Sequence, residues 1–148
     1  MKEESLEIRN KFNLALENQK RNNLNNAEKL YNEILKIEPN HLESLCYLAT
    51  LFAQTKRTDL AKKLFLKANE INPNNPSINN NLGNIFLELG ESKKALKYYE
   101  KAIKLKPDYA DAHSNLGTIL RDLGNLHDAE LAHRKAIELN PKCAEAHS

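Results

Sequence analysis

Histidine is the residue of this sequence best suited to bind a metal ion or to transfer protons, and there are five histidines. His113 and His147 occupy the same position of a repeated pattern described below. His127 and His133 are six residues apart, which places them on different faces of a helix. Neither pair has the spacing of ligands to one ion, so we expect no metal site.

The other residues that could support catalysis also lack a motif. Cys46 and Cys143 are the only cysteines, and neither belongs to a paired motif that would activate a nucleophile or bind zinc. The four glycines form no phosphate-binding loop, and no serine-centred elbow or His-Glu-x-x-His sequence is present. We therefore expect no enzyme and no cofactor. Two lone cysteines fit a reducing compartment, which predicts a cytoplasmic protein.

Composition narrows the class of partner. The 148 residues are 41% hydrophobic and 28% charged, with a net charge of +2. Because charges of both signs are interleaved, no strong field would attract a nucleic acid or an anionic membrane. No run approaches the roughly 18 apolar residues that a membrane span needs. Neither nucleic acid nor membrane is expected as a partner, which leaves a protein or peptide ligand.

Asparagine offers a different chemistry, the recognition of a polypeptide backbone. Its amide both donates and accepts hydrogen bonds, so it can pair with the C=O and N–H groups of an extended peptide. Asn13, Asn81 and Asn115 belong to one evenly spaced series, in which Tyr47 takes the place between the first two asparagines. Asparagine is also abundant elsewhere, as in "NNLNN" and "NPNNPSINNN", so compositional bias is an alternative explanation of the series.

The interval from Asn81 to Asn115 organises the whole chain. Four series of residues recur with the same period of 34 residues. They are a proline, an alanine, an aromatic residue or histidine four positions after the alanine, and a small residue twelve positions before the alanine. The series are Pro39, Pro73, Pro107, Pro141; Ala27, Ala61, Ala95, Ala129; Tyr31, Phe65, Tyr99, His133; and Ala15, Ala49, Gly83, Gly117.

Each unit has the pattern of two helices. Apolar residues recur at helical spacing over 76–89 and again over 92–106, and the same holds in the other units. Gly90 allows the left-handed backbone that ends the first helix, as do Gly124 and Asn22. Lys56 occupies this position in the second unit, so we expect that turn to be the most strained or to be built differently. We also expect the small residues to face the alanines of their own unit.

The motifs "NNLGNIF", "ALKYY" and Pro107 resemble the tetratricopeptide repeat, a helix-turn-helix unit with a period of about 34 residues. The resemblance covers four repeats, at 8–41, 42–75, 76–109 and 110–143, after an extension at 1–7. It departs from the family pattern where the usual tryptophan is replaced, by Lys11, Leu45, Asn79 and His113. The implied fold class is all-α, a right-handed superhelical solenoid of four hairpins and the start of a fifth.

The resemblance also implies a function. In this family the first helix of each repeat lines a concave groove, so the chain is expected to be a scaffold that binds an extended peptide or a partner protein there. A ladder of asparagines is a feature of the similar repeats of the O-linked N-acetylglucosamine transferases, which "AHSNLG" also resembles. The candidate peptide-binding residues are Asn13, Tyr47, Asn80, Asn81, Asn84, Ser114, Asn115 and Thr118.

Alternatives remain open. The chain can be the substrate-recruiting part of a larger enzyme, such as a glycosyltransferase. The first helices of the third and fourth repeats each carry a polar stripe, the polar residues at helical spacing outside the apolar pattern, and these stripes can be simply solvated. The first two repeats instead present apolar or aromatic residues on the side that carries the polar stripes, at Phe12, Leu16, Cys46 and Tyr47. Either they form an apolar pocket for a partner's side chain, or the first seven residues fold over them.

The last five residues, "AEAHS", resemble the "ADAHS" that opens the fourth repeat. They are expected to begin a fifth repeat of a longer array. Leu126, Leu131 and Ile137 are then expected to leave an apolar face uncovered on the last helix, because each repeat buries its face only against a neighbour. Exposed apolar faces seek partners, which predicts self-association through this end.

Overall fold

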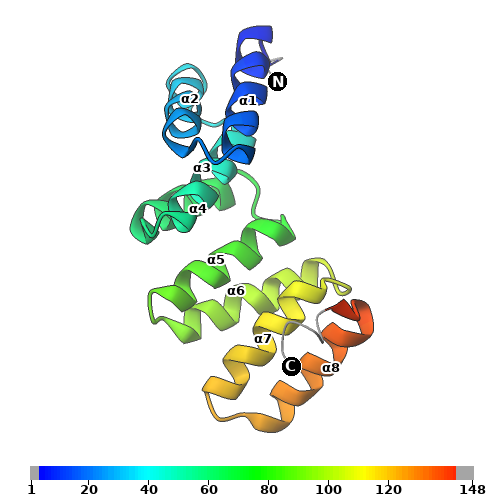
Figure 1. Cartoon of the computed structure of the whole chain (residues 1–148). Coiled ribbons are helices and arrows are strands. Elements are labelled where there is room, and N and C mark those ends of the chain that lie inside the picture. Colours follow the sequence, from blue (N-terminus) through cyan, green and yellow to red (C-terminus); the bar gives the residue numbers. More distant parts are fainter. Residues whose placement is uncertain (1–3, 143–148) are drawn as a thin grey trace. The chain divides into compact units, whose positions relative to one another are not determined.

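A computed structural model describes residues 4–142 of the chain as two compact units that meet in sequence between Ile71 and Asn72. Within these residues there are eight helices and no strand, as the all-α prediction required. Figure 1 shows the helices joined in consecutive pairs by tight turns. A right-handed superhelix through all four hairpins stays a prediction.

Each unit contains two hairpins, one per predicted repeat. The first unit consists of α1 (Leu6–Lys20), α2 (Leu24–Ile37), α3 (Leu42–Gln54) and α4 (Thr58–Ile71). The second consists of α5 (Pro76–Glu88), α6 (Ser92–Leu105), α7 (Ala110–Asp122) and α8 (Leu126–Leu139). Odd-numbered helices are the first helices of their repeats, and even-numbered helices are the second.

The turn inside every hairpin has the same construction. Asn22, Lys56, Gly90 and Gly124 have φ of 64°, 63°, 79° and 85°. In each turn the N–H group of the next residue donates to the carbonyl oxygen of the residue five positions before it. The N–H of Glu91, for example, donates to the carbonyl oxygen of Phe86 at 2.8 Å. The turn at Lys56 is therefore not built differently. It places a residue with a Cβ atom in the left-handed region, which is sterically unfavourable.

Local sequence also explains where helices begin. The Ser5 hydroxyl accepts a hydrogen bond from the Ile8 N–H at 3.2 Å and caps α1. The Asn75 side chain accepts from the Ile78 N–H at 3.1 Å and caps α5, with Pro76 in the first turn. These caps fix where α1 and α5 begin and hence which of their residues share a face.

The interior follows the repeated series, with one correction. The four alanines of the series are buried, and so are the four small residues. A Cβ added to Gly83 would lie 2.4 Å from the Tyr99 ring, and one added to Gly117 would lie 2.8 Å from the His133 ring. The glycines thus face the aromatic or histidine residue rather than Ala95 and Ala129. The prediction was wrong because the ring reaches one helical turn back across the hairpin.

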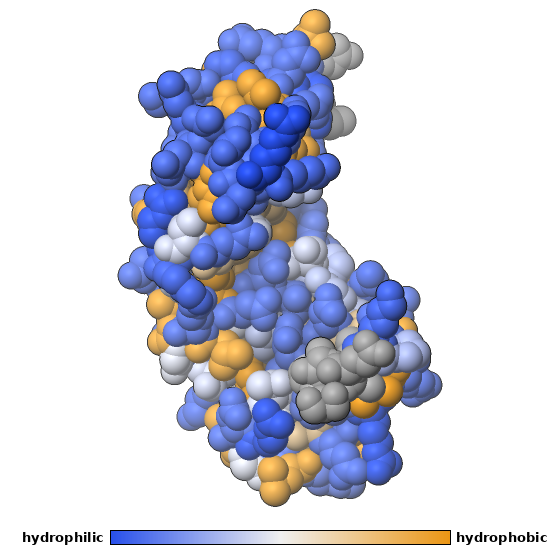
Figure 2. All heavy atoms as spheres, in the orientation of Figure 1, coloured by the Kyte–Doolittle hydropathy of each residue, from blue (hydrophilic) through white to orange (hydrophobic). Residues whose placement is uncertain are grey.

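The surface is largely hydrophilic with separate hydrophobic patches, as Figure 2 shows for one face. On α8, Leu126, Leu131 and Ile137 are 67%, 51% and 40% exposed, as the sequence predicted. The expected start of a fifth repeat at 144–148 lies outside the described residues. Among those residues, no helix has the length and the apolar character needed to cross a membrane.

Candidate functional site

The predicted polar stripes on α5 and α7 meet in the second unit. The Asn115 side chain on α7 donates from Nδ2 to Asn80 Oδ1 at 3.1 Å and to Asn84 Oδ1 at 3.2 Å, both on α5. We call the surface formed by Asn80, Asn81 and Asn84 with Ser114, Asn115 and Thr118 the amide face. The structure therefore brings together six of the eight predicted peptide-binding residues.

A tyrosine on α6 forms a hydrogen bond to the amide face. The Tyr99 hydroxyl donates to Asn84 Oδ1, so this oxygen accepts from both Tyr99 and Asn115. Tyr99 is fully buried, and burial raises the pKa of its hydroxyl well above the ordinary value. The hydroxyl therefore remains a donor at neutral pH. The sequence showed Tyr99 only as a member of the repeated aromatic series and did not reveal this hydrogen bond.

Hydrogen-bonding capacity is left over for a ligand. The NH2 group of Asn115 is already hydrogen-bonded to α5, so its carbonyl oxygen remains available as an acceptor. Asn84 Oδ1 already accepts two hydrogen bonds, so the Asn84 NH2 group remains available as a donor. Asn81 is half-buried and makes no side-chain hydrogen bond within residues 4–142. An amide held on one side and open on the other can pair with a peptide group without first losing rotamer freedom.

Other members of the face contribute less than the sequence predicted. Asn80 and Ser114 are only 5% and 7% exposed, although both were expected in a solvent-facing stripe. Asn80 Oδ1 already accepts from Asn115, so little of either side chain remains accessible to a ligand. The Thr118 hydroxyl donates to the Ser114 carbonyl oxygen at 3.2 Å, one turn back along α7. Asn81, Asn84 and Asn115 are therefore the accessible amides.

The first unit is different in character. Asn13 is exposed on α1, whereas Tyr47 on α3 is 43% exposed and lies against other rings. The centroid of Tyr47 is 5.6 Å from that of Phe12 and 6.4 Å from that of Tyr31, and the two tyrosines are stacked. Phe12 is 1% exposed. It is a core residue, so it does not form a pocket for a partner's side chain.

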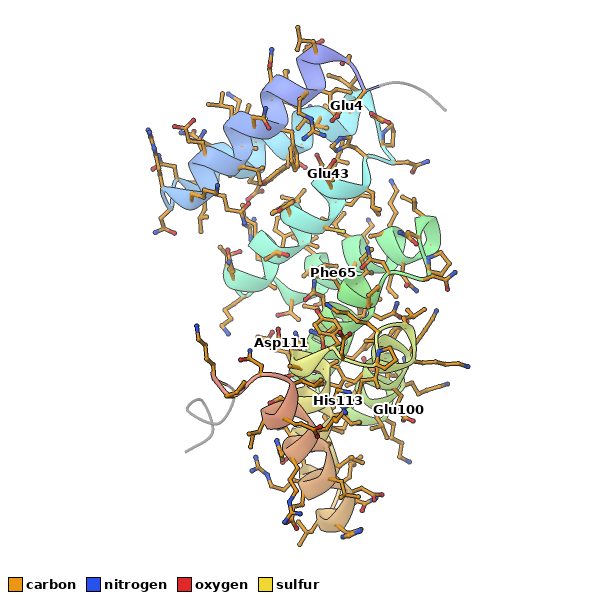
Figure 3. All side chains as sticks on the ribbon, turned by 90° about the vertical axis from the view of Figure 1, so that its right-hand side faces the viewer. Glu4, Glu43, Phe65, Glu100, Asp111 and His113 are labelled. Carbon is orange, nitrogen blue, oxygen red and sulfur yellow. The ribbon has the colours of Figure 1, made fainter. Side chains whose placement is uncertain are left out.

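Charged residues close over Phe12. The Arg9 guanidinium lies 5.0 Å above its ring and forms ion pairs with Glu4 at 2.6 Å and Glu43 at 3.0 Å. His41 Nε2 lies 2.7 Å from Glu4, as part of the same network. The group over the ring is thus the guanidinium of Arg9 on α1 itself, and Glu4 holds it there through the ion pair. Cover of this region by the first seven residues stays a prediction, because residues 1–3 lie outside the described part of the chain. Figure 3 shows Glu4 near the N-terminal end of α1 and Glu43 near the N-terminal end of α3.

This network has three possible metal ligands, because oxygen and nitrogen atoms of Glu4, His41 and Glu43 lie within 4.8 Å of one another. Arg9 binds both carboxylates, so a cation would have to displace its guanidinium. The group acts as an ion-pair network. Sequence reasoning missed it, although Arg9 and Glu43 are one repeat period of 34 residues apart.

Comparison with known proteins agrees with this architecture. Tetratricopeptide repeat models match residues 8–41, 42–75, 64–97 and 110–143, and a further repeat model of this kind matches residues 83–124. Together they cover the chain from residue 8 to residue 143. No curated protein sequence matches the chain.

Solved structures of MamA share the fold. A crystal structure of MamA is 21% identical, with a TM-score of 0.84 over 93% of this chain and 81% of that chain. A fragment of MamA from Desulfovibrio magneticus RS-1 is 18% identical, with a TM-score of 0.83 over 91% and 76%. At this identity the likeness concerns the fold alone. The helical hairpins and the matched repeats make this chain a protein-interaction scaffold that belongs to the tetratricopeptide repeat family.

Proposed function

We propose that the chain binds an extended polypeptide segment and that the amide face of the second unit pairs with its backbone. The observation that carries the proposal is the fixed orientation of Asn115, whose NH2 group is held by Asn80 and Asn84. Its carbonyl oxygen then serves as an acceptor for a peptide N–H. Asn81 supplies an amide with no partner among the described residues.

The spacing of helices suits an extended ligand. Packed helices lie about 8 to 10 Å apart, and an extended chain advances about 3.3 Å per residue. Asparagines on successive odd-numbered helices would therefore meet every third peptide group or so. Recognition through the backbone predicts a preference for extended conformation and little dependence on the ligand's side chains.

The test begins with extended peptides selected from a displayed random library against the whole chain. Asn81→Ala should weaken binding about fivefold, which corresponds to about 1 kcal/mol for one hydrogen bond. Replacing single peptide groups of the ligand by esters should weaken binding at about every third position, whereas alanine substitutions in the ligand should have little effect. The control is Asn26→Ala with Asn32→Ala, two exposed asparagines on α2.

Binding that survives Asn81→Ala unchanged, or that depends on ligand side chains and not on its peptide groups, would contradict the proposal. Asn81→Ala is preferable to Asn115→Ala because the Asn81 side chain has no hydrogen bond to lose within residues 4–142. A change in binding can then be read without a change in stability.

Two further proposals concern the surroundings of the chain. We propose that α8 mediates self-association through Leu126, Leu131 and Ile137, because these apolar side chains are exposed. Sedimentation velocity should then show a concentration-dependent larger species that Leu126→Lys removes.

We also propose that the protein lies in a reducing compartment such as the cytoplasm, since Cys46 is a free thiol.

A further inference from the structure

A cleft of about 430 Å³ lies between α6, α7 and α8 of the second unit, away from the amide face. Its floor and walls are apolar, formed by Leu96, Leu116, Leu120, Leu131 and Ala132. The volume falls within the range of small-ligand pockets, about 300 to 1,000 Å³. None of these residues was a candidate peptide-binding residue in the sequence, although Leu131 was expected in the face for self-association.

Comparison with the preceding repeat explains why the cleft is open. In the α5–α6 hairpin the rings of Phe86 and Tyr98 stack with centroids 5.3 Å apart and an interplanar angle of 6°. The equivalent residues of the fourth repeat are Leu120 and Ala132, which both line the cleft. Two aromatic rings have thus been replaced by two smaller side chains at the same place in the hairpin.

A second difference gives the cleft an apolar wall. Leu131 lies on α8 and is 51% exposed. The same position holds lysine in the other three repeats, at Lys29, Lys63 and Lys97. A leucine at a position that is otherwise charged and solvated adds hydrophobic surface beside Leu120.

Charge at the rim is also reversed relative to the preceding repeat. There the Lys94 ammonium lies 5.5 Å from the centre of the Phe86 ring. The equivalent residue of the fourth repeat is Asp128, which lines the cleft together with Glu100 and Lys135. Figure 3 shows Glu100 beside His113, which also lines the cleft. Two carboxylates and one ammonium leave a net negative rim.

We propose that this cleft is a second docking site, which binds an aromatic side chain of a partner polypeptide that carries arginine or lysine beside the ring. The ring would occupy the space that Phe86 and Tyr98 fill in the preceding repeat. The partner's cation would take the role of Lys94 and pair with Asp128 and Glu100. Cation, ring and apolar floor then reproduce an arrangement that the third repeat builds from its own residues.

The probes are three capped hexapeptides, acetyl-Gly-Ser-Arg-Trp-Gly-Ser-amide and its counterparts with Glu-Trp and Arg-Ala at the centre. Each is titrated into the ¹⁵N-labelled chain and followed by NMR. The Arg-Trp peptide should give saturable shifts at Leu116, Leu120 and Ala132. The Glu-Trp peptide should bind at least about fivefold more weakly because it meets the carboxylate rim, and Arg-Ala should give no shifts there.

Variants separate the cleft from other surfaces. Leu120→Phe with Ala132→Tyr restores the ring pair and should abolish binding, and Leu131→Lys, which copies the other repeats at an exposed position, should weaken it even if the first variant folds poorly. Glu100→Lys with Asp128→Lys should reverse the preference between the Arg-Trp and Glu-Trp peptides. The matched control, Asp111→Lys with Asp122→Lys, makes the same charge change on α7 outside the cleft lining.

Asn81→Ala should leave these shifts unchanged, so this proposal and the proposed function can fail independently. Three results would overturn the proposal. They are unchanged affinity at the same residues after Leu131→Lys, equal affinity for the two tryptophan peptides, and no shifts with any peptide. Shifts at Leu116, Leu120 and Ala132 that depend on protein concentration alone would also overturn it, because they would identify a second copy of the chain as the occupant.

Discussion

Gly83 on α5 faces the ring of Tyr99 on α6, and a Cβ atom added to the glycine would lie 2.4 Å from that ring. Tyr99 is fully buried and also donates to Asn84 in the amide face. One contact thus joins the packing of the third hairpin to the position of a candidate ligand-binding amide. A change at Gly83 is expected to affect both.

Gly83→Ala should destabilise the second unit in urea unfolding, by up to about 2 kcal/mol. The methyl group collides with Tyr99, at a cost of about 1 to 3 kcal/mol for overpacking. About 1 kcal/mol is returned by the higher helix propensity of alanine. The first two repeats hold Ala15 and Ala49 at this position, so a shifted hairpin can accept a methyl group. Tyr99→Leu in the same chain should reduce the effect of Gly83→Ala, and strict additivity would argue against the contact.

Lys56→Gly should stabilise the first unit by about 1 kcal/mol. Lys56 has a φ of 63°, where a Cβ atom costs about 1 to 2 kcal/mol and glycine does not pay this cost. The reciprocal change, Gly90→Ala, should destabilise the second unit by a similar amount. It is a clean comparison because a Cβ at Gly90 would meet nothing within 4 Å, so only backbone strain changes. An unchanged melting temperature for Lys56→Gly would contradict the expectation.

The protein should lose stability as pH rises above about 10, the ordinary pKa of tyrosine. Burial raises the pKa of Tyr31 and Tyr99 in the folded state. The unfolded chain therefore releases these protons first, and each tyrosine lowers stability by up to about 1.4 kcal/mol per pH unit above that point. Tyr31→Phe with Tyr99→Phe should flatten the pH dependence of urea unfolding above that pH. The Tyr31 hydroxyl donates to Gln19 Oε1 at 2.6 Å, and the Tyr99 hydroxyl donates to Asn84 Oδ1. The double variant should therefore also lose about 1 kcal/mol per hydrogen bond at neutral pH.

Cys46 should react slowly with iodoacetamide in the folded protein. Burial, with a smaller effect of Glu43, raises the pKa of its thiol to about 11. At mildly alkaline pH the thiolate is then roughly 200 to 300 times scarcer than for a free cysteine, whose pKa is about 8.5. Measured in a Cys143→Ser chain, the rate should increase up to a pH of about 11 and should approach that of a free thiol in urea. A plateau near the ordinary thiol pKa, about 8.5, in the folded protein would exclude the raised pKa.

Asn115→Ala and Asn81→Ala should differ in their effect on folding. Removing the Asn115 amide leaves Asn80 Oδ1, in a residue that is 5% exposed, without its donor, at a cost of about 1 to 3 kcal/mol. Asn81→Ala should change the free energy of unfolding by less than about 0.5 kcal/mol. Equal effects of the two changes would mean that the hydrogen bonds from Asn115 do not form in solution.

The sequence by itself determined the helical hairpins and their turns. The repeat period, the helical spacing of apolar residues and a residue tolerant of positive φ are local signals, so they could be read without knowledge of packing. Lys56 was noticed as a departure from the pattern, but its turn has the same construction as the other three. The burial of the four alanines followed from the same periodicity.

Only the tertiary structure decided which groups meet across helices. The contact of Gly83 with Tyr99, the hydrogen bonds from Asn115 to Asn80 and Asn84, and the ion pair of Arg9 with Glu43 all depend on packing between helices. Their partners depend on interaxial distance and side-chain rotamer, which are set by the packing of whole hairpins. A repeat period places a residue on a helix face, and only packing selects the atoms that it contacts.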